Sequence, residues 1–382
     1  GAPLLSLDVE PSGSSYELSL ASSLSTAVLV RRDNAIDLDA LARSLEGLGY
    51  VLSRGAASRA GWAYVESLGA CLAEDLLQGL DEVLEHERLA LLDAGHSRAP
   101  HLALALPREL MRFPWELMRL PARAPGQASE LLAARFALGR QMWSDRAIRR
   151  VRRDDRIRVL IVADPRTSAA ELPGARAEGE AIRALCSSMT RELGHGFAFE
   201  CDASIGETMT RTRLRQLVRE GSYDVLHFAG HAQHRADAPA QSGWLLSDGL
   251  LSVSELRNTL EWTEQPPWLI FANACGAGMV EAANHYQGEV HGMAEACIRA
   301  GVNAFVAPLW KVHDESARML ASEFYRRLLL EHASVGVALQ QARIHVGKAW
   351  ASLRSDAGLA DISWAGMVLF GNPRSEEHTS EL

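Results

Sequence analysis

The sequence predicts an α/β protein with a mainly parallel sheet, and three observations carry this prediction. Short apolar runs such as 225–229 and 268–272 stop at glycine or other small residues, as the buried strands of parallel sheets do. These runs alternate with segments of helical periodicity, which is the pattern of βαβ units. The chain of 382 residues is 47% hydrophobic and 23% charged, which is typical of a globular protein with one large or two medium domains.

Composition and charge exclude several functional classes. The net charge of −9 argues against a general nucleic-acid binder, which is usually basic. No apolar run approaches the roughly 18 residues that indicate a membrane-spanning helix. The five cysteines are scattered and odd in number, which favours a reducing compartment over a disulfide scaffold. We therefore expect a cytoplasmic protein that binds neither nucleic acid nor membrane.

The first part of the chain is predicted to open with a hairpin and to continue mainly as helix. Alternating apolar and polar residues over 4–9 and 16–21, separated by a turn containing Gly13, indicate the hairpin. The further elements expected are a helix over 38–48 closed by Gly49, one long helix or two over 60–92, a strand over 101–106 and a short helix from Phe113.

An arginine-rich segment over 140–158 separates this part from the next. It is either a solvated linker or a site for an acidic partner. We place a domain boundary here, which gives an N-terminal part over 1–150 and a C-terminal part over 151–373. The arginines that stand nearly side by side are Arg149, Arg150, Arg152 and Arg153.

Both ends of the chain look truncated or artificial. The sequence begins Gly-Ala-Pro without methionine, so we expect the natural protein to be longer. The polar segment 374–382 lacks apolar periodicity and resembles a translated sequencing adapter. The alternative is a native solvated tail.

The C-terminal part alternates predicted strands with predicted helices. Strands are expected over 158–163, 197–201, 225–231, 268–275, 304–309 and 367–370, with a hairpin over 244–251 that turns at Asp248-Gly249. Helices are expected over 175–186, 207–220, 253–260, 291–300, 315–331 and 335–349.

Two of these strands end in reactive side chains, His231 and Cys275. Working residues of open α/β sheets lie just beyond the carboxyl ends of the strands, so we expect the two to lie close together. A free thiol with a pKa near 8.5 is mostly protonated at neutral pH, and an imidazole can accept its proton. The pair therefore predicts a thiolate nucleophile with His231 as the general base. Gly276 and Gly278 would let the chain turn sharply beside it.

Less specific interpretations apply to the same residues. A lone cysteine after an apolar strand is usually a packing residue, and a lone histidine is usually structural, which is how we interpret His227. His227, His231 and His234, with Cys275, are also candidate zinc ligands. Two histidines four residues apart share one face only on a helix, however, and His227 is expected in a strand. We predict neither a metal nor an organic cofactor.

Four motifs, in order along the chain, resemble the CHAT family of caspase- and separase-like cysteine peptidases. They are His-Phe-Ala-Gly-His at 227–231, Asn-Ala-Cys-Gly-Ala-Gly at 273–278, the segment 300–312 and Phe-Gly-Asn-Pro at 370–373. The resemblance implies a caspase-like α/β/α sandwich in two subdomains, of which the N-terminal one lacks a dyad and the C-terminal one is active. It also implies that the backbone N–H groups of Ala232 and Cys275 meet the oxyanion.

Further residues are candidates for contact with a protein substrate. Asp314 follows the strand that ends near Trp310, so its carboxylate is predicted in the cleft with Trp310 as an apolar wall. Asp314 is equally suited to N-cap the helix that begins at Glu315. Trp244 is expected to border the same cleft, because the loop after His231 leads into it.

The function predicted is cleavage of a protein by a cysteine endopeptidase. The alternatives are a caspase-like interaction module whose dyad is silent and, as a third class, a zinc hydrolase. The resemblance further implies a bacterial protein in antiviral defence or cell death. It also implies activation by a partner or by a fused regulatory domain, such as a TPR array, that is absent from this chain.

Overall fold

The structure is a computed structural model that describes most of the chain. The residues described are 3–25, 28–53, 59–93, 95, 99–120, 130–146, 156–167, 169–193, 198–233, 235, 238–276, 283–357 and 361–375. Among them, no helix has both the length and the apolar character needed to cross a membrane. The predicted domain boundary and the cluster of arginines near residue 150 fall outside the described residues, so the division into two subdomains stays a prediction.

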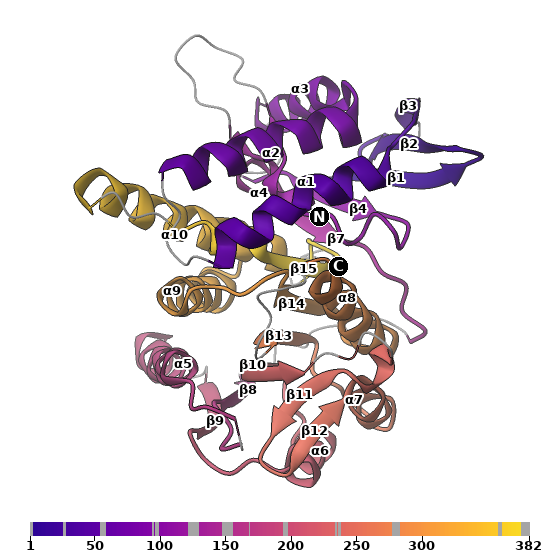
Figure 1. The fold of residues 1–382 in the computed structure, drawn as a ribbon. Coiled ribbons are helices and arrows are strands. Elements are labelled where there is room, and N and C mark those ends of the chain that lie inside the picture. Colours follow the sequence, from indigo (N-terminus) through magenta and orange to yellow (C-terminus); the bar gives the residue numbers. More distant parts are fainter. Residues whose placement is uncertain are drawn as a thin grey trace.

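One sheet of 13 strands runs through the described part of the molecule (Figure 1). Its main path follows the order β12-β11-β10-β13-β14-β15-β7-β4-β1-β2-β3, and β8 and β9 extend it beside β10. The N-terminal strands are β1 (Leu4–Ser12), β2 (Ser15–Ser22), β3 (Val28–Asn34), β4 (His101–Ala105) and β7 (Ala137–Arg140). The C-terminal strands are β8 (Arg156–Ala163), β9 (Ala198–Ile205), β10 (Val225–Gln233), β11 (Gly243–Leu246), β12 (Gly249–Ser252), β13 (Leu269–Gly276), β14 (Ala304–Pro308) and β15 (Met367–Gly371). A second, two-stranded sheet joins β5 (Arg119–Leu120) to β6 (Glu130–Leu131).

The centre of the C-terminal half is parallel, as predicted. β10 pairs in parallel with both β8 and β13, and β13 pairs in parallel with β14. Its strands are buried along most of their length, because helices cover both faces. The predicted hairpins form antiparallel pairs at β1–β2 and at β11–β12.

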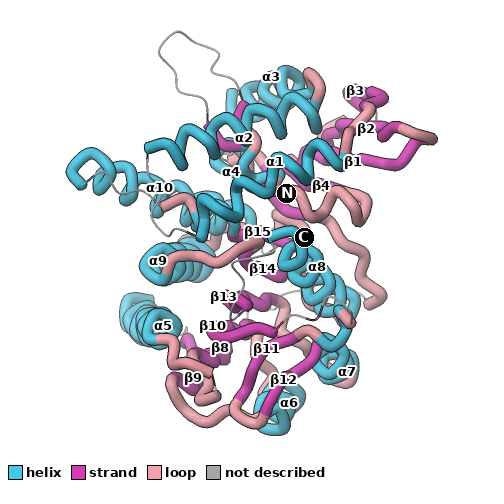
Figure 2. The backbone as a smooth tube through the Cα atoms, viewed as in Figure 1, coloured by secondary structure: helices cyan, strands magenta, loops and turns pink. Residues whose placement is uncertain are grey.

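Helices form a layer on each face of this parallel region (Figure 2). One layer contains α5 (Pro173–Leu193), α9 (Asp314–Tyr325) and α10 (Val335–Ala357), with α9 in contact with both of the others. The opposite layer contains α6 (Arg211–Glu220), α7 (Val253–Glu261) and α8 (Ala283–Arg299), with α7 in contact with both of the others. The remaining helices are α1 (Leu38–Ser53), α2 (Arg59–Leu77), α3 (Leu80–Asp93) and α4 (Leu132–Arg135), with the one-turn segments η1 (Trp115–Leu117), η2 (Pro239–Gln241), η3 (Arg326–Leu330) and η4 (Ser363–Gly366). The α/β/α architecture predicted for the fold class is therefore confirmed.

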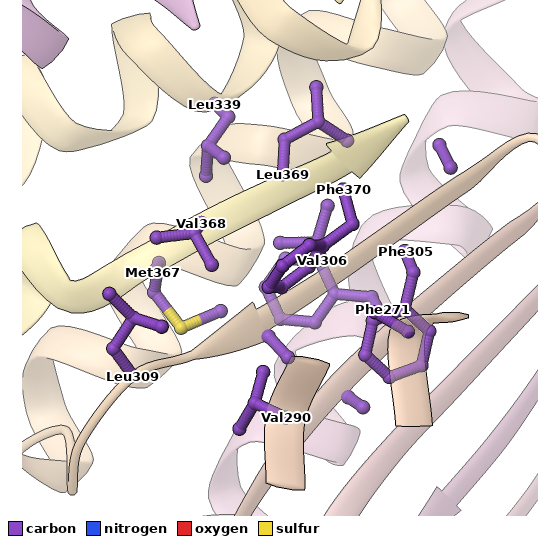
Figure 3. Close-up of a cluster of buried hydrophobic side chains, with 14 of the residues drawn as sticks. Phe271, Val290, Phe305, Val306, Leu309, Leu339, Met367, Val368, Leu369 and Phe370 are labelled. Atoms are coloured by element: carbon purple, nitrogen blue, oxygen red, sulfur yellow. The ribbon is translucent and has the colours of Figure 1, made fainter. Parts of the chain in front are cut away.

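Strand β15 joins the two halves of the sheet. It lies antiparallel to β14 on one side, and on the other Phe370 pairs with Arg140 of β7. Side chains of β13, β14 and β15 meet those of α8 and α10 in a common core (Figure 3). Phe305 and Phe370, whose ring centroids lie 6.4 Å apart, are both buried there. The last strand among the described residues thus closes the fold between its two halves.

Two details of the N-terminal helices differ from or refine the prediction. The helix predicted to end at Gly49 continues to Ser53, so Gly49 does not terminate it. The helical segment over 60–92 is two helices, because Gln78 and Gly79 take positive φ angles of 42° and 84° between α2 and α3. A left-handed pair of residues cannot continue a right-handed helix, which explains the break.

Candidate active site

His231 lies near the end of β10 with its imidazole largely buried, at 8% exposure. Its Nε2 atom is 2.7 Å from the backbone carbonyl oxygen of Ala170. A carbonyl can only accept a hydrogen bond, so Nε2 carries the proton that is donated to it. In the neutral ring the second nitrogen, Nδ1, is then the acceptor. This is the tautomer that a general base requires, since Nδ1 remains able to take a proton.

An acid at the end of β8 holds the loop that supplies the Ala170 carbonyl. Asp164 follows β8 directly and takes a positive φ of 45°. Its carboxylate accepts hydrogen bonds from the backbone N–H of Leu172, at 3.1 Å, and from Nε of Arg176, at 2.5 Å. Its own N–H donates to the carbonyl of Ala229 in β10, at 2.7 Å. Asp164 therefore ties both ends of this loop to the strand that carries His231.

Position 275 lies directly beside His231 in the sheet. The parallel register of β10 and β13 pairs His227 with Phe271, Ala229 with Asn273, and His231 with Cys275. Neighbouring strands of a sheet are about 4.8 Å apart, so the two backbones are close at this point. The structure thus brings the two predicted strand ends together, at the same rung of the sheet. The side chain of Cys275 lies outside what the structure describes.

Of the other residues predicted for this site, the structure describes some and not others. Ala232, predicted to offer its N–H to an oxyanion, pairs with Gly276 of β13 and with Trp244 of β11. Gly278 and His234 lie outside the described residues. The catalytic and oxyanion assignments therefore stay predictions.

Asp314 is not the N-cap of its helix, so that alternative is wrong. It is the first residue of α9, and the N-cap position belongs to His313, which makes no capping hydrogen bond with its side chain. The exposed Asp314 carboxylate instead lies against Gly174 in the first turn of α5, where an added Cβ would overlap it. The positive end of the α5 dipole favours an anion at this position.

The two tryptophans predicted to line the cleft are buried. Trp310 is 5% exposed and donates its indole N–H to the carbonyl of Ser363, at 2.8 Å. Trp244 is 2% exposed and stacks on Phe228, with ring centroids 4.3 Å apart. Their burial favours a packing role over direct contact with a substrate, and their assignment as substrate-binding residues stays a prediction.

The zinc alternative is disfavoured by strand geometry. His227 and His231 both lie in β10, four residues apart, which separates their Cα atoms by roughly 13 Å. The ring of His227 is enclosed by α5 and α9, since it faces Glu178 and Tyr325. Two histidines so placed cannot bind one metal ion. Among the described residues, no group of three or more His, Cys, Asp or Glu is suitably arranged for a metal.

A cavity of about 780 Å³ lies elsewhere, in the N-terminal half. Residues of α2 and the start of α3 line it together with Arg119 of β5. It is remote from the strand ends that carry His231 and Cys275. It is therefore not the cleft that the sequence predicts beside Asp314.

Three residues that support this site were not predicted from the sequence: Asp164, Ala170 and Glu178. Glu178 is only 1% exposed and contacts both His227 and Asn273. A signal for Glu178 was present, because it falls in register with the apolar stripe of α5 formed by the buried Ile182, Cys186 and Met189. An acid on the buried face of a helix indicates a buried partner. Ala170 acts through its backbone, so its side chain gave no signal.

Comparisons with known proteins agree with this fold. A sequence profile of the CHAT domain matches residues 70–372. The chain is similar to separase from Saccharomyces cerevisiae in two crystal structures of the separase–securin complex. The TM-scores are 0.54 and 0.51 at 11% and 9% identity, and each match covers 97% of this chain and 30% of that chain. The present chain thus spans under a third of the length of those separase chains.

A weaker likeness, to the Drosophila initiator caspase Dronc, covers 51% of this chain and 73% of that one. Its TM-score of 0.32 at 7% identity is too low to support an argument. No protein of curated function matches the sequence significantly.

Proposed function

Because this chain belongs to the CHAT family, we propose that it is a cysteine endopeptidase that cleaves a protein substrate with Cys275 and His231 as its dyad. The fold is that of a caspase- and separase-like peptidase. The proposal requires that the thiol of Cys275 and the imidazole of His231 face each other.

The register between β10 and β13 is the single observation that carries the proposal. Side chains alternate between the two faces of a strand, so positions 271, 273 and 275 share one face. Phe271 stacks on the ring of His227, and Asn273 donates to Glu178 of α5. That face is therefore the one that α5 covers and that His231 shares. Position 275 falls on it, one strand away from the imidazole.

The chemistry follows from the tautomer of His231. Nδ1 takes the thiol proton, and the thiolate attacks the carbonyl carbon of the scissile peptide bond. The imidazolium is stabilised because its Nε2–H still donates to the carbonyl of Ala170. It returns the proton to the leaving amine as the C–N bond breaks. Water then attacks the thioester while Nδ1 accepts one of its protons. The C–S bond breaks to release the carboxylic acid, and the imidazolium returns its proton to the thiolate, which restores the free thiol.

We place the tetrahedral oxyanion beside the backbone that follows the dyad. Ala232 and Gly276 are paired at the rung that follows His231 and Cys275. We propose that the N–H groups of Ala232 and Cys275 donate to the oxyanion. A single donor of this kind contributes about 3–4 kcal/mol to lowering the barrier. We propose that Asp314 binds substrate side chains, and that Trp310 and Trp244, which are buried, support the cleft from behind.

The regulation and setting of the peptidase are part of the same proposal. The chain spans under a third of the separase chains that it resembles, so a regulatory region outside it is in keeping with the comparison. We propose activation by a partner or by a fused domain such as a TPR array, and a role in bacterial defence or cell death in the cytoplasm.

Labelling by a thiol-reactive peptide probe tests the dyad. A peptidyl acyloxymethyl ketone is expected to label the wild type at Cys275, with no labelling of that site in Cys275→Ala and a rate at least 100-fold lower in His231→Ala. Cys71→Ala is the matched control, since Cys71 is an exposed free thiol and its loss should leave the rate unchanged. The site of labelling is identified by peptide mass spectrometry, and folding is checked by thermal unfolding.

Two outcomes oppose the proposal. Equal labelling of wild type and His231→Ala would remove the base from the mechanism. Silence of a folded wild type would support the alternative of an interaction module with a silent dyad, unless addition of the upstream chain restores labelling.

A further inference from the structure

A buried carboxylate connects the two strands of the dyad to one helix. Glu178 of α5 is 1% exposed, and its Oε2 accepts a hydrogen bond of 2.7 Å from Nδ2 of Asn273. Its Oε1 lies 3.2 Å from Nε2 of His227, which is itself fully buried. Asn273 belongs to β13 and His227 to β10. One side chain of α5 thus contacts both strands, close to the rung of His231 and Cys275.

The contacts of Glu178 lead on to a second helix, and Oε1 of Glu178 meets Nε2 of His227 at ion-pair distance without hydrogen-bond geometry. Nδ1 of His227 is 3.1 Å from the hydroxyl of Tyr325 in α9. Burial raises the pKa of Tyr325 well above its usual value, so the hydroxyl keeps its proton and can donate it to Nδ1. Ala229 lies between His227 and His231 on the same face of β10 and is paired with Asn273 of β13.

At position 178, a well-packed apolar residue would stabilise the fold without the cost of burying a carboxylate. The buried face of α5 is otherwise apolar over Ile182, Cys186 and Met189. Replacing buried ionisable pairs by well-packed apolar residues is often neutral or stabilising, because the charges no longer have to lose their hydration. The presence of Glu178, with specific partners on two strands, therefore indicates a role besides stability.

Helix α5 follows directly on the segment that carries the hydrogen-bond partner of His231, the Ala170 carbonyl, and begins at Pro173. The helix lies close on the sheet at Gly179, where an added Cβ would be 2.6 Å from Cβ of Ala163. Figure 1 shows α5 beside β8 and β10. A shift of α5 would therefore move the carbonyl that orients the imidazole.

We propose that Glu178 is a positioning residue of the dyad. It anchors α5 to His227 and Asn273, and so holds the Ala170 carbonyl at the distance from His231 that fixes the imidazole tautomer and orientation. The inference rests on the proposed function, since it concerns the same site. Glu178 acts through the helix and does not itself touch the reacting atoms.

Alkylation of Cys275 by iodoacetamide, followed by mass spectrometry across pH 5–9, tests the proposal without a peptide substrate or an activator. In the wild type, the rate below the ordinary thiol pKa reports the thiolate that His231 maintains. Glu178→Gln keeps the size of the side chain but removes its charge. It is expected to lower the alkylation rate at pH 6.5 at least 10-fold and to shift the rate profile toward that of His231→Ala. Tyr325→Phe removes only one hydroxyl and is expected to lower the rate 2- to 5-fold.

Glu116→Gln is the matched control, because Glu116 is equally buried at 1% exposure but pairs with Arg140 in the N-terminal half. A variant that is merely destabilised should keep the wild-type alkylation profile. If Glu178→Gln and Tyr325→Phe keep it as Glu116→Gln does, the positioning role is wrong, although the dyad stands. If His231→Ala also keeps it, the proposed function fails instead. With a peptidyl ketone, the positioning role predicts a lower maximal inactivation rate and an unchanged half-saturation concentration.

Discussion

Two buried pairs of an acid and a base lie in different halves of the molecule, and their surroundings differ. Glu116 and Arg140 form an ion pair with Oε2 and Nη2 at 2.5 Å and Oε1 and Nε at 3.1 Å. The guanidinium also donates to the carbonyls of Met111 and Phe113 and lies over the ring of Phe370. Every nitrogen of Arg140 therefore has an acceptor, and the charge is fully compensated.

The pair of Glu178 and His227 is looser and is shared among more elements. Its two atoms lie 3.2 Å apart, and its other partners are the amide of Asn273 and the hydroxyl of Tyr325. The pair of Glu116 and Arg140 holds the loop that contains Met111 and Phe113, and it packs against β15, where the two halves of the sheet meet. The pair of Glu178 and His227 links a helix to two strands at the candidate active site. We infer that the pair of Glu116 and Arg140 serves stability and that the pair of Glu178 and His227 serves orientation.

Removal of Arg140 should give the largest loss of stability. Arg140→Met leaves the carboxylate of Glu116 buried without its partner, and such a change lowers the free energy of unfolding by about 3–5 kcal/mol. The double variant Arg140→Met/Glu116→Leu removes both charges and should recover most of that loss. Guanidinium unfolding at pH 7 measures both. A loss under about 1 kcal/mol in the single variant would contradict the stabilising role.

A second polar contact between the two halves, that of His101 with Ser334, makes the free energy of unfolding depend on pH. Burial, followed by the nearby positive charge of Arg374, lowers the pKa of His101 to about 4, and Nε2 of His101 lies 2.7 Å from Oγ of Ser334. The folded state then binds fewer protons than the unfolded state between pH 6.5 and 4. Stability is therefore full above pH 6.5 and falls as the pH decreases through this window, by about 3 kcal/mol for this group.

The variant His101→Gln isolates this contribution, because an amide can still bond to Ser334 but does not titrate. Its unfolding free energy, measured by urea at pH 7 and pH 4.5, should fall less than that of the wild type. Burial also lowers the pKa of His291 to about 4, so some pH dependence should remain in the variant. Identical pH dependence in both proteins would show that His101 is not responsible.

The sequence was sufficient to predict the strands of the candidate site, for a physical reason. Parallel strands that are covered on both faces are mostly apolar, so β10 and β13 stand out up to His231 and Cys275, with His227 and Asn273 as polar exceptions. Their pairing then follows from the βαβ pattern. The register itself could not be predicted, because it depends on backbone hydrogen bonds between segments far apart in the chain.

The contacts around the dyad could not be predicted from the sequence, because they join residues that are far apart in the chain. Glu178 has partners on β10 and β13, and no local pattern relates these to α5. Every residue has a backbone carbonyl, so nothing in the sequence marks the carbonyl of Ala170 as the partner of His231. Asp314 shows a limit of local rules as well. Its residue type suits an N-cap, but the helix begins at Asp314 itself, and the carboxylate meets α5 instead.

Addition of one methyl group at Gly179 tests whether the orientation of His231, and not only the stability of the fold, depends on the position of α5. Gly179→Ala gains helix propensity, but its Cβ would lie 2.6 Å from Cβ of Ala163 and 3.3 Å from Ile205, so α5 must move off the sheet. We expect a net loss of about 1–2 kcal/mol in unfolding free energy, together with a slower alkylation of Cys275, since the Ala170 carbonyl moves with α5.

Gly292→Ala in α8 is the matched control. No atom lies within 4 Å of its added Cβ, so it should stabilise by about 0.5–1 kcal/mol and leave alkylation unchanged. Equal alkylation in the two glycine variants would show that close contact of α5 with the sheet does not orient His231.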